Sequence, residues 1–262
     1  DLVSYLARTE KIDRIVALDD YDVATAASLR EHLRIPGMGE TTARHFRDKL
    51  AMRVQARDEG VLVPEFTAVF NNNELNDFLH RVPAPWVLKP RFEAGAVGIR
   101  KLYEADAVWQ VVNELGDQRS FYLLEQFVVG NVCHVDSLIW EKEVVFAIAS
   151  QYGTPPLTVT TGGGIFNTRT LAHDSESSQA LIAANANLMR VLRQVRGVAH
   201  TEFIQAEADG RFYFLETAAR VGGANIDRLV EAATGIVLWQ EAARIDLASV
   251  RREAYQPPTP RG

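Results

Sequence analysis

The segment VAHTEFIQAEADGRFYFLE, residues 198–216, constrains the fold more than any other stretch of this chain. Two runs rich in β-branched and aromatic residues flank the tripeptide Ala-Asp-Gly at 208–210. This tripeptide can form a three-residue hairpin loop with glycine in the left-handed position. Such a loop pairs the strands so that Glu202 lies opposite Glu216 on one face of a mostly buried antiparallel sheet. The chain is therefore expected to contain a buried hairpin that carries two facing carboxylates.

Two carboxylates that face each other across a strand pair lie about 5 Å apart and repel each other, and burial strengthens the repulsion. A hard divalent cation that bridges them, or one shared proton, relieves it. Two other outcomes stay open. One glutamate can face solvent or pair with an arginine. A two-residue loop at Asp209-Gly210 would place Glu202 and Glu216 on opposite faces, because a one-residue slip inverts every side chain.

Short apolar runs alternate with helical patterns along the rest of the chain, which predicts an α/β (α+β) protein. Residues 1–46 are predicted as helix, strand at 13–18 and helix, like the end of a doubly wound α/β domain whose first strands are missing. Strands are predicted at 65–70, 86–90, 99–103, 121–127, 131–140, 143–152 and 165–171, and helices at 41–59, 73–81, 104–115, 175–196 and 226–248. The tail 255–262 is predicted to be disordered.

Composition excludes several classes of protein. The formal charge of −6 argues against a general nucleic-acid binder, which needs a basic surface. Cys133 is the only cysteine, which excludes a disulfide framework and a zinc site with several cysteines and suits a reducing cytoplasm. No apolar run reaches the roughly 18 residues of a membrane span, and the first residues have no signal-peptide pattern. We therefore expect a cytoplasmic protein with neither nucleic-acid nor membrane partners.

Five further segments occur in a characteristic order. They are Asp48-Lys49 followed by RDEGVLVPEF (57–66), WVLKP (86–90), RFEAGAVGI (91–99), LLEQFVVG (123–130), and TEF with LETAARVGG (201–203 and 215–223). Together they resemble the ATP-grasp superfamily over nearly the whole chain. In that family the segments are the "DK…P" segment, the "KP" strand, a glycine loop over phosphates, the adenine hinge and the metal-binding "E" and "E…R.GG". The absence of Rossmann and Walker glycine motifs weakens the dehydrogenase and P-loop alternatives.

The resemblance implies a role for each matching residue. Arg220 would hold the transferred phosphoryl group or an acyl-phosphate, and Glu202 and Glu216 would bind Mg²⁺ or Mn²⁺. The residues implied for ATP are Lys49, Lys89, Gly95, Gly98, Glu125, Gln126, Phe127, Val128 and His134. Without the resemblance, Lys49 is best interpreted as a solvated helix lysine. Lys89 ends an apolar strand, where a charge needs an anionic partner.

Two positions depart from the family pattern. Ala218 stands where the family often has an asparagine two residues after the second metal glutamate, a variant most like the L-amino-acid ligases. The chain as a whole most resembles the L-amino-acid ligase and carbamoyl-phosphate-synthase-like branch. Val132 stands where many members carry an acid for the ribose hydroxyls. His134 and Asp136 lie on the same strand face as Val132 and could contribute to the cleft instead.

The resemblance implies an ATP-grasp fold in which two α+β subdomains grip ATP, preceded by the remnant of a Rossmann-like pre-ATP-grasp domain. The expected boundaries are 1–46 for the remnant, 47–82 for linking helices and a strand, 83–126 for the lid and 127–262 for the C-terminal subdomain with the metal site. We also expect that the chain lacks part of an N-terminal region that completes the substrate side in relatives.

The implied activity is that of an ATP- and Mg²⁺-dependent carboxylate–amine ligase that forms C–N bonds through an acyl-phosphate. Its partners would be small-molecule carboxylate and amine substrates, and a homodimer is a possible assembly. Three alternatives remain: a bicarbonate-activating enzyme related to carboxylases or carbamoyl-phosphate synthase, a nucleotide-binding module without catalysis, and an unrelated α/β protein.

Overall fold

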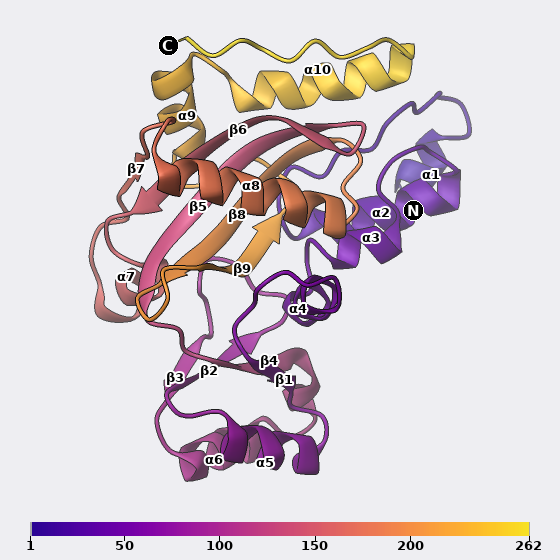
Figure 1. Ribbon diagram of the computed structural model, residues 1–262. Helices are drawn as coiled ribbons and strands as arrows, with labels where there is room; N and C mark the ends of the chain where they lie inside the picture. Colours follow the sequence, from indigo (N-terminus) through magenta and orange to yellow (C-terminus); the bar gives the residue numbers. More distant parts are fainter. Residues whose placement is uncertain (1, 262) are drawn as a thin grey trace.

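A four-stranded antiparallel sheet, ordered β1-β4-β2-β3, forms the smaller of two subdomains in the computed structural model, which describes residues 2–261 (Figure 1). Its elements are β1 (Phe66–Ala68), α5 (Asn72–Arg81), β2 (Trp86–Pro90), β3 (Arg100–Leu102), α6 (Ala105–Leu115), η1 (Gly116–Phe121) and β4 (Tyr122–Gln126). Leu75 and Phe78 of α5 pack with Val108 of α6 against Leu88 and Leu124 of the sheet. These apolar side chains recur at helical spacing, so both helices cover one face of the sheet.

The larger subdomain contains a five-stranded antiparallel sheet, ordered β7-β6-β5-β8-β9. Its strands are β5 (Gly130–Trp140), β6 (Glu143–Tyr152), β7 (Thr168–Thr170), β8 (Gly197–Ala206) and β9 (Phe212–Ala218). Its helices are α7 (Pro156–Gly162), α8 (Glu176–Val191), α9 (Ile226–Thr234) and α10 (Leu238–Arg251). Two antiparallel sheets with covering helices confirm the predicted α+β class. No helix among the described residues combines the length and the apolar composition needed to cross a membrane.

The central strand β5 is buried on both faces, and its alternation decides which residues can reach the functional cleft. Cys133, Val135 and Ile139 pack into the core that also contains Leu181 and Leu188 of α8. The intervening residues of β5 point to the opposite face, because side chains alternate along a strand. On that face Leu138 packs with residues of α9 and α10, whereas His134 and Asp136 occupy the part nearer to the smaller subdomain.

Helix α4 (Lys49–Asp58) lies at the junction of the two subdomains (Figure 1). Its Met52 and Ala56 belong to the core of the larger sheet. Arg53, on the same helix, donates through Nε to Glu125 of β4 at 3.1 Å. The N-cap Asp48 accepts from the amide of Leu50 and also pairs with Arg91, which follows β2. One helix therefore contacts both sheets and sets their relative position.

The N-terminal segment forms α1 (Leu2–Leu6), α2 (Asp22–Leu33) and α3 (Glu40–Arg44). The strand predicted at 13–18 is wrong, since these residues pair with no strand in the part of the chain that the structure describes. A strand needs a neighbouring backbone, and here a side chain supplies the hydrogen bond instead: Arg30 of α2 donates to the carbonyl of Ile15 at 2.8 Å. The structure thus shows no sheet that would identify this segment as a Rossmann-like remnant.

Two further expectations differ from the structure. Residues 66–82, expected in the linking segment 47–82, join the smaller sheet instead, because β1 pairs with β4 and α5 packs in the same core. The disorder predicted for 255–262 is also wrong for its described part. Tyr255 is buried against Trp140, and the amide of Arg261 donates to the carbonyl of Thr234 at 2.9 Å. The tail therefore runs back along α10 and docks at both ends (Figure 1).

Candidate active site

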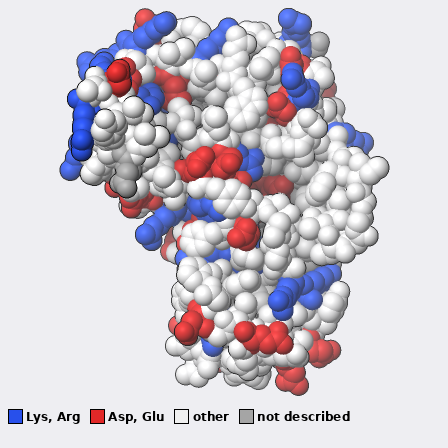
Figure 2. All heavy atoms as spheres, turned by 180° about the vertical axis from the view of Figure 1, so that it is seen from behind, with Lys and Arg blue, Asp and Glu red and all other residues white. Residues whose placement is uncertain are grey.

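A cavity of about 720 Å³ lies between the two subdomains and is lined by residues from both. Figure 2 shows acidic and basic side chains gathered where the larger and the smaller subdomain meet. Ten of the twelve site residues predicted from sequence line the cavity: Lys49, Lys89, Gly95, Glu125, Gln126, Phe127, Val128, Glu202, Glu216 and Arg220. Gly98 and His134 do not. Segments far apart in the sequence thus converge on one place.

The predicted opposition of Glu202 and Glu216 on β8 and β9 is confirmed, but it arises by another route. The hairpin loop has four residues rather than three, because the last pair before the turn is Ala206 and Arg211, where the amide of Ala206 donates to the carbonyl of Arg211. That loop alone would put Glu202 opposite Leu215. A β-bulge at this point adds one residue to β9 and brings Glu216 back opposite Glu202. The facing carboxylates therefore depend on the bulge.

Each glutamate has one carboxylate oxygen that faces a polar partner and one that accepts no hydrogen bond from the described residues. Tyr152 donates its hydroxyl to Oε1 of Glu202 at 2.8 Å, and Lys49 approaches Oε2 of Glu216 at 3.0 Å. Burial alone would raise the pKa of Glu216, but the ammonium of Lys49, followed by Lys89 and Arg53, lowers it to about 2. Two opposed carboxylates with available oxygens fit Mg²⁺, which prefers oxygen ligands.

Lys49 is not the solvated helix lysine that its local sequence suggests. Its side chain is 9% exposed, and besides the pair with Glu216 it donates to the carbonyl of Glu93 in the glycine loop. Lys49 is the first residue of α4, and its own amide donates to the carbonyl of Arg91 at 3.0 Å. The side chain therefore lies between the loop and the opposed glutamates.

Lys89 has the anionic partner that its position at the end of an apolar strand requires. It pairs with Glu125 on the neighbouring strand β4, and Arg53 approaches the other oxygen of the same carboxylate. Burial opposes ionisation of Glu125, but Arg53 and Lys89 together lower its pKa below the usual range. Glu125 therefore positions Lys89, which lines the cavity.

The glycine loop between β2 and β3 has two glycines with different surroundings. Gly95 lines the cavity with φ of +66°, and a Cβ there would meet no atom within 4 Å. Gly98 has φ of +71°, and a Cβ there would lie 2.9 Å from Cγ of Pro90. Gly98 thus permits close packing of the loop on β2, whereas Gly95 leaves its backbone accessible from the cavity.

In the predicted hinge, one of the three backbone amides of Gln126, Phe127 and Val128 is free. The amide of Gln126 donates to the carbonyl of Glu65, and that of Phe127 donates to the carbonyl of Pro85. The amide of Val128 makes no such bond to the described residues. Val128 also packs beside Val132, so Val132 belongs to an apolar surface. Among these three residues, the amide of Val128 is the one available to read a base.

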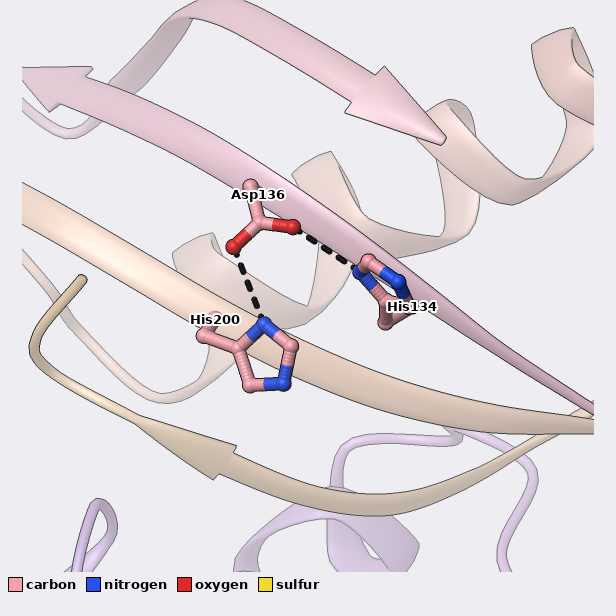
Figure 3. A group of neighbouring side chains, drawn as sticks. All are labelled: His134, Asp136 and His200. Atoms are coloured by element: carbon pink, nitrogen blue, oxygen red, sulfur yellow. Dashed lines mark hydrogen bonds and ion pairs between the residues drawn. The ribbon is translucent and has the colours of Figure 1, made fainter. Parts of the chain in front are cut away.

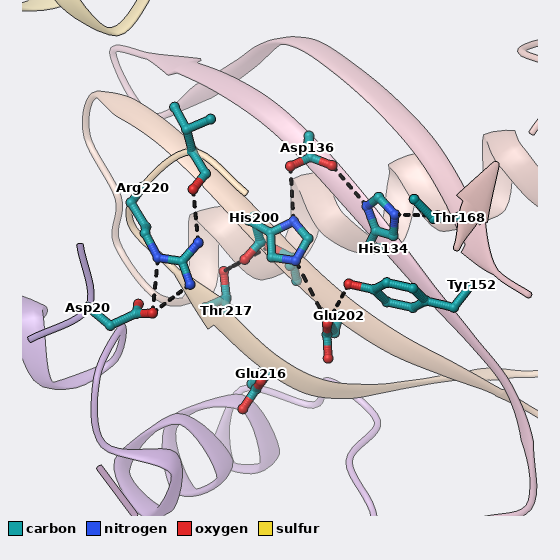
Figure 4. Close-up of polar contacts among 12 residues, drawn as sticks. Asp20, His134, Asp136, Tyr152, Thr168, His200, Glu202, Glu216, Thr217 and Arg220 are labelled. Atoms are coloured by element: carbon teal, nitrogen blue, oxygen red, sulfur yellow. Dashed lines mark hydrogen bonds and ion pairs between the residues drawn. The ribbon is translucent and has the colours of Figure 1, made fainter. Parts of the chain in front are cut away.

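Arg220 follows β9 and has an acidic partner in the N-terminal segment. Its Nε donates to Oδ2 of Asp20 at 2.9 Å, and NH2 donates to the same oxygen (Figure 4). Its NH1 donates to the carbonyl of Val221 at 2.8 Å. Asp20 and Arg220 both line the cavity. The N-terminal segment thus contributes directly to the site.

Behind the opposed glutamates lies a set of polar residues, of which the sequence indicated His134 and Asp136 but not His200, Tyr152 and Thr168. His134 and His200 both bond to Asp136 between them, and Tyr152 and Thr168 lie at the edge of this set (Figure 4). Burial alone lowers the pKa of His200, but Asp136 and then Glu202 raise it to about 10. The signal that could have revealed His200 is the spacing His200-x-Glu202, which matches His134-x-Asp136 and puts both pairs on one face of adjacent strands.

A small antiparallel subdomain faces a larger one across a cavity lined by two lysines and two opposed glutamates, the arrangement of the ATP-grasp fold seen in the solved structures that match it. The chain has that fold. No family model matches the sequence. The chain is 23% identical over 252 residues to the L-arginine-specific L-amino acid ligase of Bacillus subtilis, covering 94% of this chain and 60% of that protein.

Two solved structures show the same fold. The L-amino acid ligase from Bacillus licheniformis superposes with a TM-score of 0.73 and 22% identity, covering 92% of this chain and 57% of that one. The D-alanine–D-alanine ligase from Bacillus anthracis complexed with ATP superposes with a TM-score of 0.69 and 17% identity, covering 97% and 86%. The chain therefore spans about 60% of the length of the L-amino acid ligases that it matches.

Proposed function

We propose that this chain forms the ATP-binding and catalytic part of a carboxylate–amine ligase that depends on Mg²⁺ or Mn²⁺. The observation that carries the proposal is the convergence of Glu202 and Glu216 with Lys49, Lys89 and Arg220 on one cavity. Opposed carboxylates suit a divalent cation, and three cations around them suit phosphates. The small-molecule ligases among its relatives and the ATP complex of a structural neighbour support the same assignment.

The reaction has two steps. The carboxylate of the first substrate attacks the γ-phosphorus of ATP, so that a C–O–P bond forms and ADP leaves. The amine of the second substrate then attacks the acyl carbon, a C–N bond forms, and phosphate leaves as the nitrogen loses a proton. A divalent cation on Glu202 and Glu216 would supply charge neutralisation between the phosphates. The chain itself orients the reactants and compensates charge.

Individual residues have separate tasks in this proposal. Lys49 and Lys89 contact the phosphates, and Glu125 holds Lys89 in place. Arg220 contacts the transferred phosphoryl group, with Asp20 fixing the direction of its guanidinium. The amide of Val128 donates to the adenine edge, and the backbone N–H groups at Gly95 approach the phosphates.

The small subdomain, residues 66–126, acts as a lid in this proposal. It carries Lys89, Gly95 and the start of the hinge, so its closure over ATP would complete the phosphate contacts and exclude water from the acyl-phosphate. The single, buried Cys133 suits the reducing cytoplasm in which we place the protein.

The test measures ADP and phosphate release with ATP, Mg²⁺ and a panel of amino acids. The proposal expects release that requires both an acid and an amine, and Mg²⁺-dependent binding of ATP by calorimetry. Glu216→Gln should abolish turnover while the far-UV circular dichroism spectrum is unchanged. Glu207→Gln, on the exposed hairpin loop, is the matched control and should keep wild-type turnover. ATP binding without turnover on any pair would favour the nucleotide-binding module instead.

A further inference from the structure

Asp136 is fully buried on the cleft face of β5, and both of its carboxylate oxygens are engaged by histidines (Figure 3). Oδ2 lies 2.9 Å from Nδ1 of His134 on the same strand, and Oδ1 lies 2.9 Å from Nδ1 of His200 on β8. Burying a carboxylate is costly unless it is paired and hydrogen-bonded. The two imidazoles meet that requirement and leave their Nε2 atoms directed away from Asp136.

Both imidazoles connect Asp136 to Glu202, one of the opposed glutamates (Figure 4). Nε2 of His200 lies 3.7 Å from Oε1 of Glu202, the oxygen that also accepts the hydroxyl of Tyr152. The ring of His134 packs on the ring of Tyr152 with a centroid separation of 4.8 Å. Glu202 therefore has two polar neighbours, His200 and Tyr152. His200 is hydrogen-bonded to Asp136, and Tyr152 packs on His134, which is also hydrogen-bonded to Asp136.

The loop that carries Arg220 also packs on Asp136 and His200. A Cβ at Gly222 would lie 2.8 Å from Oδ1 of Asp136 and 2.9 Å from Nδ1 of His200. A methyl group at this position would thus press on the hydrogen bond between these two atoms. The buried pair of Asp136 and His200 therefore lies against both Glu202 on β8 and the loop after β9.

We propose that Asp136 is a positioning residue for the cation site, because it fixes the carboxylate of Glu202 through His200 and through His134 and Tyr152. This inference rests on the proposed function, in which Glu202 binds the cation. Partners of metal ligands orient the ligating atoms, and their loss typically weakens metal binding by 10–100-fold. Asp136 itself touches neither substrate nor cation.

His134, Asp136 and His200 also have the residue types of a transition-metal site, with one possible ligand atom of each within 4.8 Å of the others. In the structure, however, the Nδ1 atoms of both histidines are hydrogen-bonded to the aspartate. The three side chains thus satisfy one another, which favours a positioning role over a second metal site.

The experiment compares the full chain with its Asp136→Asn variant, which keeps the side-chain shape and removes the charge. ATP binding is measured by calorimetry over a series of free Mg²⁺ concentrations. The variant should need about 10-fold or more free Mg²⁺ for half-maximal ATP binding, whereas its ATP affinity at saturating Mg²⁺ stays within about twofold of wild type. Gly222→Ala, which keeps Asp136, should raise the Mg²⁺ requirement in the same direction and serves if Asp136→Asn does not fold.

Ser137→Ala is the matched control. Ser137 follows Asp136 on β5 but points to the opposite face, where it accepts a hydrogen bond from Asn185 of α8 at 3.2 Å. This variant should lower the thermal midpoint without changing the Mg²⁺ requirement. An unchanged requirement in Asp136→Asn and Gly222→Ala, or an equal change in Ser137→Ala, overturns the inference. So does one equivalent of zinc that wild type retains and Asp136→Asn loses. Wild-type chain that binds no Mg²⁺-dependent ATP refutes the proposed function instead.

Discussion

Asp20 and Arg220 lie 200 residues apart in the sequence and form an ion pair at the edge of the cavity. Asp20 is almost fully buried, and both Nε and NH2 of Arg220 donate to its Oδ2 atom. The pair connects the N-terminal segment to the loop after β9. The N-terminal segment thus orients Arg220, the arginine that we propose contacts the transferred phosphoryl group.

Replacing Asp20 by asparagine should lower kcat/KM about tenfold or more, because hydrogen bonds to a charged group contribute about 1.5–3 kcal/mol and 1.4 kcal/mol corresponds to a factor of ten. Steady-state kinetics with the best acid and amine measure the effect. Asp19→Asn is the control, since Asp19 accepts from the amides of Tyr21 and Asp22, and asparagine serves equally well at such a position. Equal rates in both variants would exclude a role for Asp20.

Glu125→Gln should destabilise the fold by about 3–5 kcal/mol, because it leaves Arg53 and Lys89 without their buried anionic partner. Arg53 is 0% exposed and stacks over Phe214 at 5.3 Å, so its charge cannot turn to solvent. Urea unfolding of Glu125→Gln, Arg53→Met and the double variant measures the coupling, and the double variant should lose less than the sum of the single losses.

The exposed pair between Arg81 and Glu65 provides the comparison for this cycle. Its nitrogen–oxygen distance is 2.8 Å, but both side chains are more than half exposed. Glu65→Gln should change the free energy of unfolding by less than about 1 kcal/mol, as is usual for surface ion pairs. A loss as large as that of Glu125→Gln would show that burial is not what distinguishes the two pairs.

Cys133 should stay unreactive toward iodoacetamide at pH 9 in the folded protein and react once the chain is unfolded. Burial raises the pKa of its thiol to about 11 from the usual 9.0, so the reactive thiolate is scarce in the native state. The unfolded chain ionises first as the pH rises. The contribution of the neutral, buried thiol to the free energy of unfolding is therefore complete below pH 9 and is lost between about pH 9 and 11. Alkylation followed by mass spectrometry with and without urea measures it, and rapid native labelling contradicts the burial.

Tyr255→Phe should lower the free energy of unfolding by about 1–3 kcal/mol, because the hydroxyl of Tyr255 donates to the buried carboxylate of Glu241 at 2.6 Å. The result separates a docked tail from a disordered one, since a hydroxyl on a disordered tail contributes nothing. Tyr5→Phe, on an exposed tyrosine of α1, is the control and should leave the urea midpoint unchanged. The same midpoint for Tyr255→Phe as for wild type would refute docking of the tail.

Local pattern accounts for the strands and helices that form the two sheets. Alternation along β5 already placed His134 and Asp136 on one face, and the flanking runs at 198–216 already indicated a hairpin with facing acids. The opposition of Glu202 and Glu216 was correctly predicted with the wrong loop, because a bulge compensates for one additional loop residue. No residue pattern marks the bulge between β8 and β9, so only the paired strands reveal it.

The sequence alone determined the class of fold, the order of most elements and ten of the residues that line the cavity, because periodicity and short motifs depend on near neighbours in the chain. Tertiary structure decided which charges meet. Lys49 pairs with Glu216, Lys89 and Arg53 share Glu125, and Asp20 pairs with Arg220. Each partner lies on a different element, and the path of the chain in space, which no local pattern encodes, sets the distance between them.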